Sequence, residues 1–169
     1  MTQLASCEIC TILPAVDEAF IFAQTEHWQV NLADRDQTVL GRSYIGLKRH
    51  AAELDELTEV EEYEFRDLRN GLVAAIRASF SPVNFNVACL KNDAFKADPD
   101  NTPPEAAHIH WHILPRYDSN PTEVNGEIFT DPMPGRYLMI SPATARRPSR
   151  DTAVQIAHTI RSNWPVVVQ

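Results

Sequence analysis

Three histidines alternate with apolar residues in the segment 108–116 (HIHWHILPR), which holds half of the six histidines of the chain. β-Branched and aromatic residues fill the intervening positions, so the segment predicts a β-strand bounded by Pro115. Successive side chains of a strand point to opposite faces. The imidazoles therefore share one face, about 7 Å apart, while Ile109, Trp111 and Ile113 pack on the other. Such a row can act on a phosphate group or bind a metal ion.

The apolar pattern of the rest of the 169-residue chain predicts an α+β fold with an antiparallel sheet of about five strands. The segments expected as strands, besides the histidine segment, are 27–32, 38–48, 84–90, 127–129 and 135–141. The first two of these are separated by a polar turn, so we expect them to form a hairpin.

Helices are expected on one face of this sheet and at the C-terminus. Residues 58–80 show apolar side chains every three or four positions, and Thr58 with Glu61 fits a capping box. A C-terminal helix is expected over 152–163, capped by Asp151. A short helix is expected within 14–24, and the segment 96–105, rich in Pro, Asp and Asn, predicts a surface loop.

The net charge of −8 and the pI near 5.2 argue against nucleic acid as a partner, because phosphate backbones select basic surfaces. A small anionic substrate is compatible with this charge if cations converge locally, and Lys91, Arg116 and Arg136 are the candidates near the histidine row. No apolar run approaches the length of a membrane span, and no basic segment followed by an apolar one opens the chain. We therefore expect a cytoplasmic protein without a membrane partner.

Cys7 and Cys10 form a C-x-x-C motif for which three interpretations compete. A redox pair should follow a strand and open a helix, and no strand-like run precedes Cys7. Two unpaired cysteines are the second interpretation, and half of a tetrahedral zinc site is the third. Cys89 lies in an apolar run and is interpreted as a buried core thiol.

The alternating histidines, followed by Pro115, Arg116 and Tyr117, resemble the signature of the histidine-triad (HIT) superfamily of nucleotide hydrolases and transferases. The stretch 40–58 (LGRSYIGLKRHAAELDELT) is similar to the HIT segment in which a Gly-led strand runs into Lys-x-His and a helix. The resemblance covers about residues 5–118. It implies one HIT-like domain over 1–169, with a C-terminal extension from about 119, and a homodimer.

In the zinc-bearing branch of this superfamily, a C-x-x-C motif, the Lys-x-His histidine and the first triad histidine hold the metal. Carried over to this chain, the resemblance implies four zinc ligands: Cys7, Cys10, His50 and His108. Such a Cys₂His₂ set has no open coordination position, which is typical of structural zinc.

The same resemblance assigns the chemistry to the other two histidines of the row. His110 is expected to attack the α-phosphorus of a nucleotide and form nucleotidyl-histidine, which water then hydrolyses. His112 is expected to hydrogen-bond the phosphate or the leaving-group atom, while His108 orients the row. Histidine is partly neutral near pH 6.5, so we expect activity to fall below about pH 6.

Three further residues are expected to bind substrate. The resemblance places a ribose contact at Asp34 and an amide contact at Asn92, and Arg116 is the local cation. Two departures from the HIT pattern stand out. Residues 105–107 (Glu-Ala-Ala) replace the usual Gly-Gln-Ser/Thr before the triad, and Arg42 follows Gly41 where the family has Gly-His.

The function expected on these grounds is a nucleotide hydrolase acting at the α-phosphate of dinucleoside polyphosphates or nucleoside phosphoramidates. A nucleotidyltransferase with an unknown acceptor and a nucleotide-binding module without turnover are the alternatives. A catalytic His₃ metal centre and a solvated, inert row are the other interpretations of the triad. The sequence does not choose the leaving group, the base or the acceptor, and it gives the C-terminal extension no function.

Overall fold

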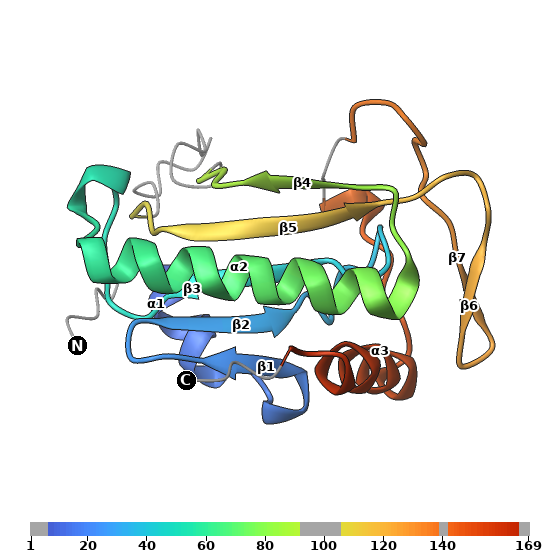
Figure 1. Cartoon of the computed structure of the whole chain (residues 1–169), viewed down its shortest axis with the longest axis horizontal. Coiled ribbons are helices and arrows are strands. Elements are labelled where there is room, and N and C mark those ends of the chain that lie inside the picture. Colours follow the sequence, from blue (N-terminus) through green and yellow to red (C-terminus); the bar gives the residue numbers. More distant parts are fainter. Residues whose placement is uncertain (1–6, 92–105, 139–141, 166–169) are drawn as a thin grey trace.

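The computed structural model describes residues 7–91, 106–138 and 142–165. Five antiparallel strands form one sheet in the order β1-β2-β3-β5-β4 (Figure 1). Their bounds are Ile21–Gln24 (β1), Trp28–Leu32 (β2), Ser43–Leu47 (β3), Asn84–Ala88 (β4) and His110–Arg116 (β5). Strands β6 (Thr122–Val124) and β7 (Glu127–Phe129) form a separate pair. The prediction of an α+β fold with a five-stranded antiparallel sheet is confirmed.

Three α-helices accompany the sheet in the described ranges: α1 (Glu8–Ile12), α2 (Glu59–Phe80) and α3 (Arg150–Ser162). The capping box predicted at Thr58 and Glu61 is present at the start of α2. The predicted C-terminal helix is also present, but its cap is Ser149, whose hydroxyl accepts from the Thr152 amide. Asp151 lies inside the first turn, so the predicted cap was wrong. A serine two residues earlier satisfies the same amides.

Two predicted strands differ from the structure. Only 43–47 of the segment 38–48 is a strand, because the buried Gln37 side chain folds the preceding residues into a turn. Its amide nitrogen donates to the Ala33 and Arg42 carbonyls, and its oxygen accepts from the Gly41 amide. Residues 135–138 form no strand, and 139–141 lie outside the described residues.

The segment 14–24 is not the short α-helix expected. It contains two 3₁₀ turns (Leu13–Ala15 and Glu18–Phe20) and the edge strand β1. Other 3₁₀ turns lie at Leu54–Glu56 and Pro142–Thr144. The predicted loop 96–105 lies outside the described residues.

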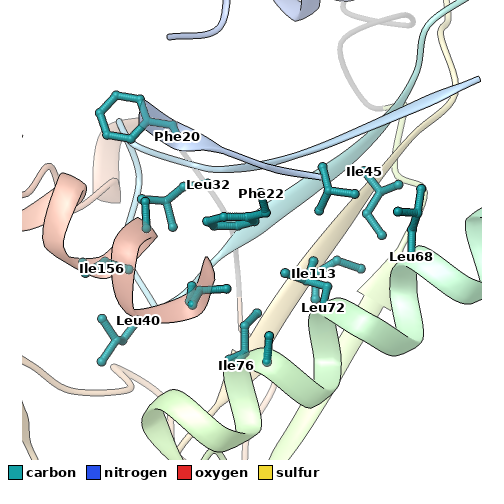
Figure 2. Packing of buried hydrophobic residues seen from close by; sticks show 14 of the residues in the cluster. Phe20, Phe22, Leu32, Leu40, Ile45, Leu68, Leu72, Ile76, Ile113 and Ile156 are labelled. Atoms are coloured by element: carbon teal, nitrogen blue, oxygen red, sulfur yellow. The ribbon is translucent and has the colours of Figure 1, made fainter. Parts of the chain in front are cut away.

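The apolar face of the sheet packs against α2, while α3 lies beside β1 and contacts α2 (Figure 1). Figure 2 shows Ile45 and Ile113 of the sheet beside Leu68, Leu72 and Ile76 of α2. Because neighbouring residues on a strand alternate, burying Ile113 on this side sends His112 to the opposite face. None of the helices in the described ranges has the length and apolar character of a membrane span.

Candidate active site and metal site

The polar face of the sheet carries the histidine row predicted from the sequence. His110 and His112 lie on β5, and their cross-strand neighbours on β3 are Gly46 and Tyr44. His108 lies just before the strand begins and is 3% exposed, whereas His110 and His112 are half-buried. The row therefore has a closed end at His108 and a more open end at His112.

The closed end brings together Cys7, Cys10, His50 and His108, and their ligand atoms all lie within 4.8 Å of one another. His108 Nδ1 lies 3.2 Å from Cys7 Sγ and 3.4 Å from Cys10 Sγ. His50 Nδ1 lies 3.6 Å from Cys10 Sγ. The four residues that the resemblance had grouped thus form one cluster of metal-ligating atoms.

This donor set fits a zinc ion. With Zn–S near ~2.3 Å and Zn–N near ~2.0 Å, sulfur and nitrogen ligands of a tetrahedral site lie about 3.6 Å apart. His108 Nε2 lies 2.8 Å from the Leu47 carbonyl oxygen, to which it must donate. Its proton is therefore on Nε2, and the lone pair of Nδ1 faces the two sulfur atoms. A carbonyl that fixes the ligating tautomer is a regular feature of histidine metal ligands.

Local structure brings each ligand into place. Cys7 is the N-cap of α1, and its Sγ accepts from the Cys10 amide, which holds both thiols on one side of the first turn.

Leu13 follows α1 and packs over Gly46 on the histidine face. A Cβ at Gly46 would lie 2.9 Å from a methyl group of Leu13, so glycine permits this close approach. Sequence reasoning had given Gly46 no role.

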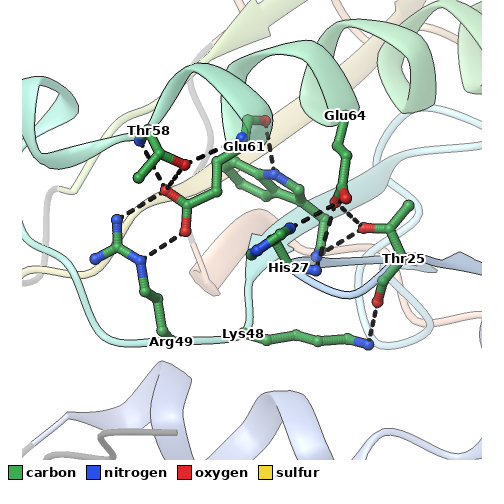
Figure 3. A network of polar contacts seen from close by, with 8 residues as sticks. Thr25, His27, Lys48, Arg49, Thr58, Glu61 and Glu64 are labelled. Atoms are coloured by element: carbon green, nitrogen blue, oxygen red, sulfur yellow. Dashed lines mark hydrogen bonds and ion pairs between the residues drawn. The ribbon is translucent and has the colours of Figure 1, made fainter.

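His50 is positioned by its neighbour Arg49, which is bonded to helix α2 (Figure 3). The Arg49 guanidinium donates to both carboxylate oxygens of the buried Glu61, at 2.6 and 2.8 Å. This guanidinium lowers the pKa of Glu61 to about 2, with the Thr58 amide and hydroxyl assisting against burial. The capping box of α2 is therefore also the anchor of the segment that presents His50.

At the open end, hydrogen-bond geometry assigns the tautomers of His110 and His112. His110 Nδ1 lies 2.9 Å from the His108 carbonyl oxygen, which only accepts, so Nδ1 carries the proton. The lone pair of His110 is then on Nε2, which lies 3.2 Å from His112 Nε2. His112 must donate from Nε2, and its own lone pair is on Nδ1.

Arg42 lies against that Nδ1 atom. It is 3% exposed, and its Nη2 lies 3.5 Å from His112 Nδ1 and donates to the Tyr44 hydroxyl at 3.2 Å. Its Nη1 is paired with Asp36, while its buried Nε has no hydrogen-bond partner. Burial, a positive charge on His110 and this guanidinium lower the pKa of His112 to about 3. His112 is therefore neutral, with its proton on Nε2.

The sequence had marked Arg42 only as a departure from the HIT pattern, and it had missed Asp36 and Tyr44. Both Arg42 and Tyr44 lie in the predicted strand 38–48, two positions apart, so that prediction places the two side chains on one face. The histidine face could not be matched to that face without the register between β3 and β5.

The residues expected to bind substrate are less closely grouped. Asp34 lies in the turn after β2 and lines a cavity of about 310 Å³ together with Arg147 and Arg150. Arg116 is buried, and its guanidinium pairs with Asp131 at 2.7 and 3.1 Å. The same guanidinium donates to the Met133 carbonyl and to Asn86 Oδ1.

The Arg116 guanidinium thus has three protein residues as hydrogen-bond partners, and its role as a substrate contact stays a prediction. The same holds for Asp34, because no hydrogen bond or ion pair within the described ranges joins it to the triad. Asn92 lies outside the described residues.

No protein-family model matches this sequence, and no curated protein matches it. The fold does match solved structures. A zinc-bound histidine triad family protein from Mycobacterium smegmatis has a TM-score of 0.56 at 18% identity, over 93% of this chain and 94% of that chain. A diadenosine triphosphate hydrolase from Plasmodium falciparum has a TM-score of 0.54 at 15% identity, over 87% and 77%.

A uridylyltransferase has a TM-score of 0.63 at 17% identity, over 96% of this chain but 46% of that chain. The chain thus spans about half the length of that enzyme. At these identities the matches establish the architecture, which agrees with the resemblance seen in the sequence motifs. The chain has the fold of the histidine-triad proteins.

Proposed function

We propose that this protein is a nucleotide hydrolase that cleaves at the α-phosphate of a nucleoside 5′-phosphate derivative through a nucleotidyl-histidine intermediate. The observation that carries the proposal is the tautomer of His110. A carbonyl oxygen 2.9 Å from Nδ1 accepts a hydrogen bond from it, so the proton of this ring is on Nδ1 and the lone pair is on Nε2, at the open end of the row. An imidazole held in this form is an activated nucleophile without a separate general base.

The first step forms a bond between His110 Nε2 and the α-phosphorus while the bond to the leaving group breaks. In the structure, the Nε2 atoms of His110 and His112 are joined by a hydrogen bond, so the phosphate must enter between them. His112 then directs its Nε2 proton at a phosphate oxygen or the leaving atom. Because His112 is neutral, it donates this hydrogen bond and does not electrostatically repel a positive charge on another histidine of the row.

The second step is attack of water on the phosphorus, which releases the nucleoside monophosphate and restores His110. Arg42 holds the tautomer of His112 in both steps, since its guanidinium faces Nδ1 and only donates. Tyr44 supports the arrangement, because its ring packs edge-on against His112 with centroids 5.1 Å apart. The protein thus contributes a fixed nucleophile and a fixed donor.

We also propose that zinc binds to Cys7, Cys10, His50 and His108 and has a structural role. When bound, zinc would cross-link the N-terminal segment to the ends of two strands and leave no open position for substrate. Support comes from the donor geometry, and a zinc-bound protein is among the fold matches. Cytoplasmic location, a single domain over the whole chain and a homodimer remain predictions.

The second candidate function is nucleotidyl transfer to an acceptor other than water. It is favoured by the uridylyltransferase among the fold matches, and it shares the first step. The two candidates differ only in what attacks the intermediate. A diadenosine triphosphate hydrolase with the same fold supports water as the acceptor.

The test is product analysis after incubation with diadenosine tetraphosphate, adenosine phosphoramidate and an AMP ester, with His110→Ala as the control. We expect AMP from at least one substrate with wild type and none above background with the variant. Covalent nucleotide on wild type, without AMP, would indicate the transferase. Nucleotide binding without either product would contradict the proposal and leave a binding module.

A further inference from the structure

A cavity of about 740 Å³ lies on the histidine face, over the β4–β5 end of the sheet. Its floor comprises Asn84, Asn86 and Ala88 of β4 with Leu114 and Arg116 of β5. These residues share the face of His112, because they alternate with residues that point to α2. Ala88 is the cross-strand partner of His112, so the cavity begins beside that ring and extends about 13 Å to Arg116.

The cavity contains a cation that no described residue neutralises. Of the three cations expected near the triad, Lys91 is paired with Glu53 at 2.8 Å and Arg116 with Asp131 at 2.7 Å. The side chain of Arg136 lines the cavity, is exposed, and has no hydrogen bond or ion pair to any residue of the described ranges. No acidic residue is among the described residues that line the cavity. In a chain of net charge −8, this site is locally positive.

The other walls offer apolar and aromatic surface. Val83, Leu90, Leu114 and Leu138 contribute apolar side chains, and Tyr137 presents a ring that is 82% exposed. An exposed aromatic ring beside a free arginine suits a planar base joined to phosphates, since the ring stacks and the guanidinium pairs with phosphate oxygens. A sugar phosphate would use the cation but would gain little from the ring.

Size separates the candidate leaving groups. The ammonia released from a phosphoramidate needs about the space of one water, roughly 30 Å³. A cavity of about 740 Å³ is in the range that holds nucleotide-sized ligands. It also lies on the side of His112, the histidine expected to hydrogen-bond the phosphate or the leaving-group atom.

We propose that this cavity binds the leaving group of the reaction, and that this group is a nucleoside phosphate held by Arg136 and Tyr137. The inference rests on the proposed function and selects dinucleoside polyphosphates among its substrates. The bond from His110 Nε2 to the α-phosphorus forms as the phosphorus–oxygen bond to the leaving group breaks. The nucleoside phosphate departs with that oxygen and its electron pair. Water then releases the nucleoside monophosphate, so no further co-reactant is needed.

The test compares two substrates with the same transferred AMP and different leaving groups. For wild type, Arg136→Met and Tyr137→Ala, kcat/KM is measured with diadenosine tetraphosphate and with adenosine phosphoramidate. We expect the ratio of the two values to fall about tenfold in each variant, mainly through KM of the tetraphosphate. Arg66→Met is the matched control, because Arg66 is also an exposed arginine but lies on α2, which packs on the opposite face of the sheet. Its ratio should stay within about twofold of wild type.

A ratio unchanged in both cavity variants would overturn the inference while AMP release dependent on His110 still supports the proposed function. A third substrate, AMP linked to a hexose phosphate, identifies the occupant. If the two variants lose as much kcat/KM with it as with the tetraphosphate, the nucleoside assignment is overturned in favour of a sugar phosphate. Absence of AMP from all substrates overturns the proposed function instead, and the inference falls with it.

Discussion

His108 and His112 lie four residues apart on the same face of the same strand segment, yet their surroundings give them different tasks. Burial lowers the pKa of both, so both are neutral imidazoles. At His108 the lone pair of Nδ1 faces two thiols, and at His112 the lone pair of Nδ1 faces a guanidinium. The first arrangement suits a metal ligand, and the second suits a hydrogen-bond donor with its proton on Nε2.

The covers of the two ends differ as well. The metal end is closed by α1 and Leu13, and it is anchored to α2 through Arg49 and Glu61. At the His112 end, the cross-strand neighbour Ala88 lines the cavity of about 740 Å³. Under the proposed function, what lies opposite each ring gives three regularly spaced histidines different tasks, one structural and two chemical.

The largest effect should come from removing a metal ligand. Cys10→Ser is expected to abolish stoichiometric zinc and to lower the free energy of unfolding by at least about 3 kcal/mol, because binding of structural zinc supplies on the order of 10 kcal/mol. Metal analysis and urea unfolding measure both quantities. Cys89→Ser is the matched control, since this half-buried thiol lies outside the cluster. Equal losses in the two variants would contradict a metal site at this end.

Arg42→Met tests the other end. We expect kcat to fall about a hundredfold, because the guanidinium no longer keeps the proton on His112 Nε2, and positioned proton donors contribute 10²–10⁴-fold. The ¹⁵N shifts of the His112 ring report its tautomer directly. The single variant leaves the Asp36 carboxylate without its ion-pair partner. The double variant Arg42→Met/Asp36→Asn removes this carboxylate as well, so that a loss of kcat can be distinguished from a loss of folding. Zinc content should not change, and a wild-type kcat in a folded double variant would refute the role of Arg42.

The pH dependence of stability provides a third test. The pKa of His112 is about 3 in the folded chain and near 6.5 when unfolded, so the unfolded state binds a proton first as pH falls. The contribution of His112 is complete above about pH 6.5 and is lost toward pH 3, with a slope of up to about 1.4 kcal/mol per pH unit. Urea unfolding of wild type and His112→Asn should show a shallower slope in the variant. Parallel curves would mean that His112 is not held neutral.

The smallest effect is expected at Gly46, where the cover of the metal end meets the sheet. Gly46→Ala should cost about 1 kcal/mol of unfolding free energy, because the new methyl group displaces the end of the flexible Leu13 side chain. In a Leu13→Ala background the same change should cost almost nothing. Additive losses in this double-mutant cycle would show that Leu13 does not pack over Gly46 in solution.

Several features of the fold could be predicted from the sequence because the signals are local. Alternation in 108–116 defines the face that each histidine occupies, and the apolar spacing with the capping box defines α2. The turn before β3 was predicted as strand, because the side-chain hydrogen bonds of Gln37 that fold it have no sequence signal. The prediction of the α3 cap was wrong because serine and aspartate are both acceptable caps, and the sequence does not choose between Ser149 and Asp151.

In the candidate site, too, some features could be predicted from the sequence and others depend on the fold. The four residues of the metal cluster were predicted through the resemblance to the zinc-bearing HIT branch, whose C-x-x-C and Lys-x-His motifs can be matched residue by residue. Arg116 was expected to face an anion, but its partner Asp131 lies 15 residues later and is brought to it by the fold. Neither the length nor the composition of the intervening segment indicates that pairing.

The sequence by itself determined which residues of 108–116 share the histidine face, because strand alternation is a property of neighbouring residues, and its motifs resemble those that bind zinc in HIT proteins. Only the tertiary structure decided the task of each histidine. The tautomer of His110 follows from the carbonyl of His108, two residues earlier, and that of His112 follows from the guanidinium of Arg42, which the register of β3 and β5 brings to the ring. Protonation depends on what a ring faces across space, and sequence order does not encode that.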